Sequence, residues 1–213
     1  MRQPHEASQL IVLHTMRCIG HAGAERVAGA SGMPQDEVEQ QLDHLRERGF
    51  VTFDEGVFGG WSLTKAGKEW AETAIRREVE EANASSMVQS AYQGFLPLNG
   101  VVMAICHDWQ MQSLGGRPVA NDHSDHRYDD AVLARLSSAN ESAQRICESL
   151  ADGLGRFAVY GHRLTNALRR AHDGELQYVT DDLESYHSVW FQLHEDLLVT
   201  SGISREEERE QGL

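Results

Sequence analysis

The second half of the chain places arginine, tyrosine and histidine side chains at the spacing of helix faces. Arg156, Tyr160 and Arg163 recur at i, i+4 and i+7, so they would share one side of a helix. Two histidines flank a phenylalanine at the same spacing further along. Guanidinium groups bind carboxylates or phosphates through two parallel hydrogen bonds, so such a cluster suits a polar or anionic small molecule. The candidate effector pocket comprises Trp109, Arg156, Tyr160, Arg163, His187, Phe191 and His194.

The two arginines also have a purely structural interpretation. Arg156 and Arg163 could pair with Asp129, Asp152 or Glu195 and hold the helices together without any ligand. Both interpretations are open at this point.

A histidine-containing loop is the candidate for metal binding. His123 and His126 form an HxxH pair that is flanked by Asp122, Asp125 and Asp129, and imidazole is a ligand that zinc prefers. Histidine and aspartate are also common in turns and helix caps, which is the ordinary explanation for this loop. We therefore expect no metal and no other cofactor.

Neither the cysteines nor the known catalytic motifs indicate an enzyme. Cys18, Cys106 and Cys147 are widely spaced and include no CxxC pair, which favours buried free thiols over a disulfide framework or a zinc ribbon. Cys106 and His107 are adjacent, so on a helix they point about 100° apart and cannot act as nucleophile and base. The sequence contains no GxSxG, P-loop, GxGxxG or HExxH motif. We expect no enzymatic activity.

Length and composition predict one large or two small globular domains. The chain has 213 residues, of which 40% are hydrophobic, enough for a packed core. No apolar run approaches the roughly 20 residues that span a bilayer, and the N-terminus lacks the charged-then-apolar pattern of a signal peptide. We therefore expect a cytoplasmic protein with no membrane partner.

The most regular pattern lies in the first third of the chain. Val38, Leu42 and Leu45 fall at i, i+4 and i+7, which predicts an amphipathic helix with a C-cap at Gly49. Two strand-like runs joined by an Asp-Glu-Gly turn follow, and they predict a β-hairpin at 50–63.

Further helices are expected on both sides of this pattern. Thr64 predicts the cap of a following helix, with Gly67 in its first turn. Upstream, apolar spacing and glycine breaks predict helices at 10–19 and 24–30, and Pro34 suits the first position of the next helix. The order is therefore three helices, a hairpin and a fourth helix.

This order is that of a winged helix-turn-helix. Over residues 8–75 the chain resembles the winged-helix domains of MarR-type and related bacterial transcriptional regulators. The resemblance implies a homodimer whose third helix binds double-stranded operator DNA.

Charge opposes this implication, because duplex DNA is a polyanion that is bound largely through Lys and Arg. The net charge is −14, and residues 1–84 contain nine Lys and Arg against 14 Asp and Glu. Asp36, Asp43 and Glu47 lie on the expected outer side of the third helix, where an acid can read only a cytosine amino group. The candidate DNA contacts, glutamines for bases and cations for phosphates, are Gln35, Gln40, His44, Arg46, Arg48 and Lys65.

Two functions follow from these observations. The first is a dimeric DNA-binding transcriptional regulator controlled by a small-molecule effector. The second is a winged-helix module for protein interaction or dimerisation with little affinity for DNA. The fold resemblance favours the first function, and the charge favours the second.

The remainder of the chain is expected to be an all-helical, bundle-like domain. Glycine and Pro97 predict a broken helix within 87–113, and a loop is expected at 114–128. The last helix is predicted at 181–200, with Leu183 on its apolar face. The expected segments are a winged helix-turn-helix at 1–67, a connector helix at 68–86, an all-helical ligand-sensing and dimerisation domain at 87–203 and an acidic tail at 204–213.

This second half has a resemblance of its own. The runs NGVVMAICHDWQ (99–110), NDH (121–123), YGHRL (160–164) and SYHSVWFQLHEDL (185–197) are similar to a group of bacterial proteins labelled winged-helix or MarR-like regulators. The helical C-terminal domain of that group has no assigned ligand. The resemblance implies a regulator without indicating what it senses.

Overall fold

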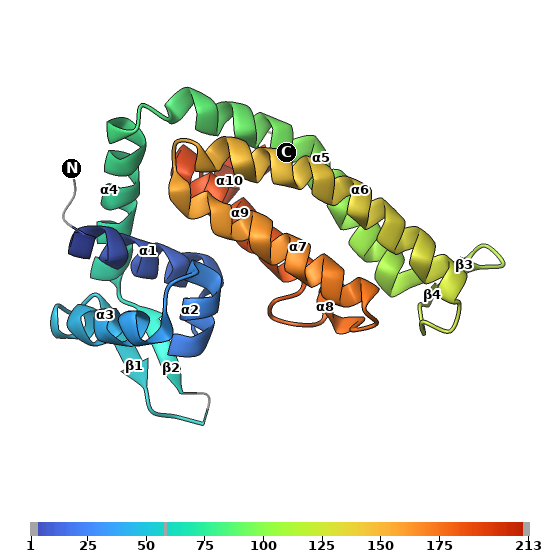
Figure 1. Cartoon of the computed structure of the whole chain (residues 1–213), viewed down its shortest axis with the longest axis horizontal. Helices are drawn as coiled ribbons and strands as arrows, with labels where there is room; N and C mark the ends of the chain where they lie inside the picture. The colour runs from blue at the N-terminus through green and yellow to red at the C-terminus, as the bar shows by residue number, and fades with distance from the viewer. Residues whose placement is uncertain (1–3, 58, 211–213) are drawn as a thin grey trace. The chain divides into compact units, whose positions relative to one another are not determined.

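The computed structural model describes residues 4–57 and 59–210, and within these ranges the chain is mainly helical. Helix accounts for 73% of the structure, with ten α-helices and two small two-stranded sheets among the described residues (Figure 1). The predicted mainly-α fold class is confirmed at this level. No helix in these ranges is both long enough and apolar enough to cross a bilayer.

The described residues divide into two compact units. The first contains the chain up to Ser85 together with the stretch that begins at Glu195, and the second contains Ser86–His194. The division suggested by the sequence differs, because it assigns residues 195–203 to the C-terminal domain. The later part of the last long helix therefore belongs, by its contacts, with the N-terminal elements.

The first unit begins with three helices, a hairpin and a fourth helix. Its elements are α1 (Pro4–Ile19), α2 (Ala24–Ser31), α3 (Gln35–Glu47), β1 (Val51–Asp54), β2 (Gly60–Leu63) and α4 (Lys65–Glu81). The apolar residues of α3 predicted to face inward, Val38, Leu42 and Leu45, are completely buried. They pack with Leu13 of α1 and Val27 of α2 in one hydrophobic core. Burial of these side chains, at about 25 cal/mol per Å² of apolar surface, holds the short helices together.

The predicted end of α3 and start of α4 are confirmed, whereas α1 begins at Pro4 rather than at 10, Pro34 is the N-cap of α3 rather than its first residue, and α4 ends at Glu81 rather than at 86. Gly49 follows α3 with a φ of +74°, a conformation that glycine adopts without strain. Thr64 is the N-cap of α4, and its Oγ1 accepts a hydrogen bond from the Gly67 backbone N–H at 3.1 Å. Gly67 also lies directly against Phe50, because a Cβ on Gly67 would be only 2.1 Å from the Phe50 carbonyl oxygen. This close contact fixes the start of α4 against the beginning of the hairpin.

The hairpin pairs antiparallel strands in a regular register. Val51 is opposite Leu63 and Asp54 is opposite Gly60, so the second strand starts later than predicted and the connection is longer. Phe58, which the sequence places in the second strand, lies outside the described residues. Ala22, in the segment between α1 and α2, adds an isolated antiparallel bridge to Trp61 with both backbone hydrogen bonds formed, at 3.2 and 2.8 Å. The hairpin is thereby attached to the helical part of the unit.

The second unit consists of long helices and a second hairpin. Its elements are α5 (Ser85–Gln110), β3 (Met111–Leu114), β4 (Arg117–Ala120), α6 (His126–Ala151), a short 3-10 helix (Gly155–Phe157), α7 (Ala158–His172), α8 (Gln177–Thr180) and the first part of α9 (Tyr186–Ser201). Helices α6 and α7 pack closely against each other. Leu164, Leu168 and Ala171 recur at helical spacing in α7, and all three are buried.

Three expectations for this unit are wrong. The predicted broken helix is one continuous element, α5, with Pro97 inside it. Proline removes one intrahelical hydrogen bond, but buried residues on both sides, among them Phe95 and Val102, hold the helix in place. The predicted loop at 114–128 contains the β3–β4 hairpin, whose turn is formed by Gly115 and Gly116, both with positive φ.

The chain before α9 also departs from the expectation. A separate helix, α8, precedes a bend, and α9 begins at Tyr186 rather than at 181. Leu183 therefore lies outside the helix and is exposed. The acidic tail forms α10 (Arg205–Glu210), in which Glu208 is buried.

Candidate functional site

Helix α3 presents a mixed but mainly acidic outer face. Gln35, Gln40, Arg46 and Arg48 are exposed, and His44 is half-buried. The exposed acids on the same helix are Asp36, Glu39, Asp43 and Glu47. The predicted inward and outward sides are thus correct, and so is the excess of negative charge on the outer side.

Most of the candidate DNA contacts already have a partner within unit 1. Gln35 donates a hydrogen bond to Glu39 at 2.8 Å, and the guanidinium of Arg46 lies 3.4 Å from the carboxylate of Asp43. The ammonium group of Lys65 lies 3.8 Å from Glu69. Such exposed pairs contribute less than about 1 kcal/mol each, so a phosphate can compete for the cations.

Two further candidates are held by side chains of α1. Arg48 donates to the Oε1 of buried Gln9 at 2.7 Å, and its guanidinium stacks on the Phe50 ring. The ring of His44 packs edge-on against His5, with ring centroids 4.9 Å apart. Gln40, in contrast, makes no side-chain hydrogen bond within the described part of the chain and is exposed.

The hairpin next to α3 carries exposed apolar surface and no Lys or Arg. Val57 is 97% exposed and Phe53 is 43% exposed, although the Phe53 ring packs against Trp61 at a centroid distance of 4.9 Å. The turn contains Asp54 and Glu55. The hairpin therefore offers apolar and acidic contacts.

In unit 2, several candidate effector residues contact side chains outside the candidate set. Arg163 is only 9% exposed and donates two hydrogen bonds of 2.9 Å to Glu184 and one of 2.7 Å to Gln192. This is the structural interpretation of the arginine, with Glu184 as the partner in place of the three acids named from the sequence. The guanidinium of Arg156 lies over the Phe157 ring at 4.4 Å.

The aromatic candidates and the histidines lie in different surroundings. Phe191 is 54% exposed, Tyr160 is buried and His187 is half-buried. The buried His194 ring packs against Phe95 at a centroid distance of 4.8 Å. The indole of buried Trp109 packs against His123 instead.

The HxxH loop is organised by hydrogen bonds. The Nδ1 of His123 lies 3.0 Å from Asp129, and Asn121 donates to the same carboxylate group at 2.8 Å. His126 is exposed at the first position of α6, behind the N-cap Asp125. His123 therefore belongs to a polar cluster with Asn121 and Asp129, whereas His126 is the first residue of α6.

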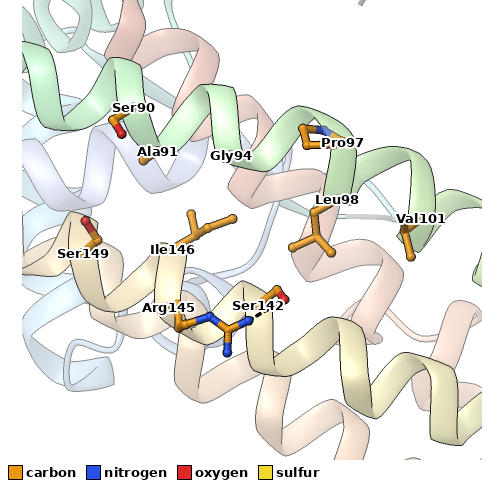
Figure 2. A pocket seen from close by; sticks show the side chains of 10 residues that line it. All are labelled: Ser90, Ala91, Gly94, Pro97, Leu98, Val101, Ser142, Arg145, Ile146 and Ser149. Atoms are coloured by element: carbon orange, nitrogen blue, oxygen red, sulfur yellow. Dashed lines mark hydrogen bonds between the residues drawn. The ribbon is translucent and has the colours of Figure 1, made fainter.

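Unit 2 has a groove between α5 and α6 that the sequence analysis did not identify. Its volume is about 490 Å³, within the range typical of small-molecule sites. Small and apolar side chains line it, and Figure 2 shows Ile146 and Leu98 projecting into it from opposite helices. The lining residues are Ser90, Ala91, Gly94, Pro97, Leu98, Val101, Ser142, Arg145, Ile146 and Ser149.

One cation lies in this mostly apolar groove. Arg145 donates a hydrogen bond to the hydroxyl of Ser142 at 2.8 Å, and it forms no ion pair with the residues that the structure describes (Figure 2). The spacing of Gly94, Leu98 and Val101 along α5 was available in the sequence, but it is equally typical of ordinary core packing. Only the fold shows that this stripe and the α6 stripe form one groove.

Comparisons with known proteins identify no relative. No family model, curated protein or solved structure matches the chain.

Proposed function

We propose that this protein is a winged helix-turn-helix transcriptional regulator that acts as a homodimer. Unit 1 binds double-stranded operator DNA, with α3 as the recognition helix and the β1–β2 hairpin as the wing. The observation that carries the proposal is the backbone bridge between Ala22 and Trp61, because it attaches the hairpin to the segment between α1 and α2, in addition to the required order of elements. Within this proposal Gln40 contacts a base edge, and Arg46 and Arg48 contact phosphates.

The α5–α6 groove is the proposed effector site. Its apolar lining and the guanidinium of Arg145 suit an amphipathic molecule with one carboxylate, because the carboxylate can pair with arginine while the apolar part is buried. Arg163 suits this role less, since its Nε and Nη2 already donate to Glu184 and Gln192.

DNA binding is tested by fluorescence anisotropy with a duplex from the gene's own upstream region and a scrambled duplex of equal length. The expected result is tighter binding to the native duplex, with an affinity that falls as salt increases. Gln40→Ala should reduce the preference for the native duplex. If neither duplex binds at micromolar protein in low salt, the DNA proposal is wrong.

A charge variant of α3 should change the affinity for DNA in a known direction. Asp43→Asn removes a negative charge from α3 and releases Arg46 from its ion pair, so binding should tighten and the salt slope should steepen by about 1. The matched control is Asp130→Asn, which neutralises an exposed aspartate of α6 in unit 2. Equal effects of the two variants would argue against α3 as the DNA-contacting helix.

The effector site is tested with octanoate and its neutral counterpart 1-octanol as probes, by calorimetry on the full chain. Gly94→Leu should abolish binding of octanoate, because the new side chain enters the groove without a clash at its Cβ. Gly100→Leu is the matched control, since Gly100 is also an α5 glycine with open space but does not line the groove. Arg145→Met should remove the preference for the carboxylate over the alcohol.

A second function, as a protein-interaction module, is favoured by one observation. The hairpin exposes Val57 and Phe53 next to an acidic helix face, which is the chemistry of a surface for a partner with an apolar and basic patch. In that case Asp43→Asn would weaken partner capture, and no duplex would bind.

A further inference from the structure

Two helices of unit 1 bring a histidine, a cysteine and an aspartate together in its interior. His14 and Cys18 are four residues apart on α1, and Asp196 lies on the part of α9 that belongs to this unit. All three side chains are buried. One ligand atom from each lies within 4.8 Å of the other two. From the sequence alone, Cys18 is predicted only to be a buried thiol.

The distances are close to those of a metal centre. The Nε2 of His14 lies 2.9 Å from the Oδ1 of Asp196 and 3.8 Å from the Sγ of Cys18. Around a tetrahedral zinc ion, the usual bond lengths put a nitrogen and an oxygen about 3.3 Å apart, and a nitrogen and a sulfur about 3.6 Å apart. These two distances therefore need changes of only a few tenths of an ångström, and the Cys18 and Asp196 ligand atoms lie within 4.8 Å of each other.

The ligand chemistry is also consistent with zinc. Imidazole nitrogen, thiolate sulfur and carboxylate oxygen are the three side-chain donor types that zinc uses. The hydroxyl of Thr200, one turn further along α9, donates to the same Oδ1 of Asp196 at 2.9 Å and orients the carboxylate. A site with three protein donors leaves the fourth tetrahedral position for water.

We propose that unit 1 binds one zinc ion through His14, Cys18 and Asp196. The ion would connect α1 to the last part of α9 and would hold the stretch from Glu195 onward on the N-terminal elements. This proposal does not rest on DNA binding, and it concerns residues separate from the histidine loop of unit 2. Because Cys18 must lose its proton and His14 must be neutral, affinity should fall as the pH is lowered.

The first test is a cobalt titration of the full chain after treatment with EDTA. One equivalent of Co²⁺ should give visible bands of tetrahedral coordination and a near-ultraviolet thiolate-to-cobalt charge-transfer band, and Zn²⁺ should displace both. Cys18→Ser should lose the charge-transfer band. Cys147→Ser, a buried cysteine of unit 2, is the matched control and should retain it. Thr200→Val should weaken zinc binding by about 10- to 100-fold.

A second measurement uses the unaltered protein, so it does not depend on whether the Cys18 variant folds. Alkylation with N-ethylmaleimide in mild denaturant, with and without Zn²⁺, is followed by mass spectrometry of the cysteine peptides. Zinc should protect Cys18 selectively over Cys106 and Cys147. The proposal is overturned if no cobalt thiolate band forms, if the band survives in Cys18→Ser, or if zinc protects the three cysteines equally.

Discussion

Replacing Arg163 by methionine separates a structural role of this arginine from a ligand-binding role. The guanidinium is 9% exposed and donates hydrogen bonds to Glu184 and Gln192. Methionine retains much of the apolar length of the side chain while removing its donors. A structural arginine predicts a loss of stability in the absence of any ligand.

The expected loss is about 1–4 kcal/mol. The amide of Gln192 is only 3% exposed, and leaving its oxygen without a donor costs about 1–3 kcal/mol. Glu184 is 37% exposed, so water screens its pair with Arg163, and the lost ion pair adds less than about 1 kcal/mol. The second replacement Gln192→Leu, made in the Arg163→Met background, should recover part of the loss because it removes the unsatisfied oxygen.

Urea unfolding followed by far-ultraviolet circular dichroism measures the effect as a lower midpoint at an unchanged m-value. Arg169→Met is the matched control, because Arg169 lies on the same helix and pairs with Asp173, but both side chains are about 60% exposed. The control should change stability by less than about 0.5 kcal/mol. If the two variants lose equal stability, or if Arg163→Met loses none, the structural role assigned here is refuted.

Two further predictions concern stability. Gly67→Ala should lower the free energy of unfolding by about 3 kcal/mol, because its Cβ would lie 2.1 Å from the Phe50 carbonyl oxygen. Gly29→Ala, in a helix with open space, should be slightly stabilising. Thermal unfolding of both variants checks this prediction, and equal melting temperatures would contradict it. Burial raises the pKa of Cys106 from 9.0 to about 12, so the folded state favours the neutral thiol. The contribution of this thiol to the free energy of unfolding is therefore complete below pH 9 and is lost as the pH rises toward 12. Urea unfolding between pH 8 and 11 should show a smaller decline for Cys106→Ala than for the unaltered chain, and identical slopes would count against a buried neutral thiol.

Local signals in the sequence predict much of unit 1. The apolar spacing of α3, the cap at Thr64 and the left-handed Gly49 each depend on residues within one or two turns of one another. Such features can be predicted from the sequence because the interactions that cause them are short-range. The bridge from Ala22 to Trp61 joins residues far apart in the chain, so no local pattern indicates it.

Unit 2 shows where local reasoning fails. Gly115 and Gly116 suit a tight hairpin turn, but the strands beside them have only four residues each and include Pro118, so the composition also fits a loop. Pro97 predicts a break, yet the buried side chains before and after it keep α5 continuous. Tertiary packing therefore outweighs the local preference of Pro97.

Candidate sites are harder to predict than elements, because their chemistry depends on partners that meet only in the fold. Tyr160 and Arg163 lie on one helix as predicted, but Arg156 precedes that helix in the 3-10 helix, and Glu184, the partner of Arg163, lies in the bend before α9. His14 and Cys18 are visible as an i, i+4 pair, whereas nothing near them in the sequence indicates Asp196. Periodicity predicts which side of a helix a residue lies on, but it does not predict which side chain of another element that residue contacts.

The charge on α3 distinguishes the two proposed functions more sharply than the fold does. The ion pair between Arg46 and Asp43 is exposed on both sides and weak, so it does not prevent Arg46 from binding a phosphate. The four exposed acids on the helix oppose any polyanion, and their effect is largest at low salt, where screening is weakest. A DNA-binding α3 would therefore show a shallow dependence of affinity on salt, which Asp43→Asn steepens. A protein-binding α3 would instead lose affinity for a basic partner when the same charge is removed. The two functions thus predict opposite signs for one substitution.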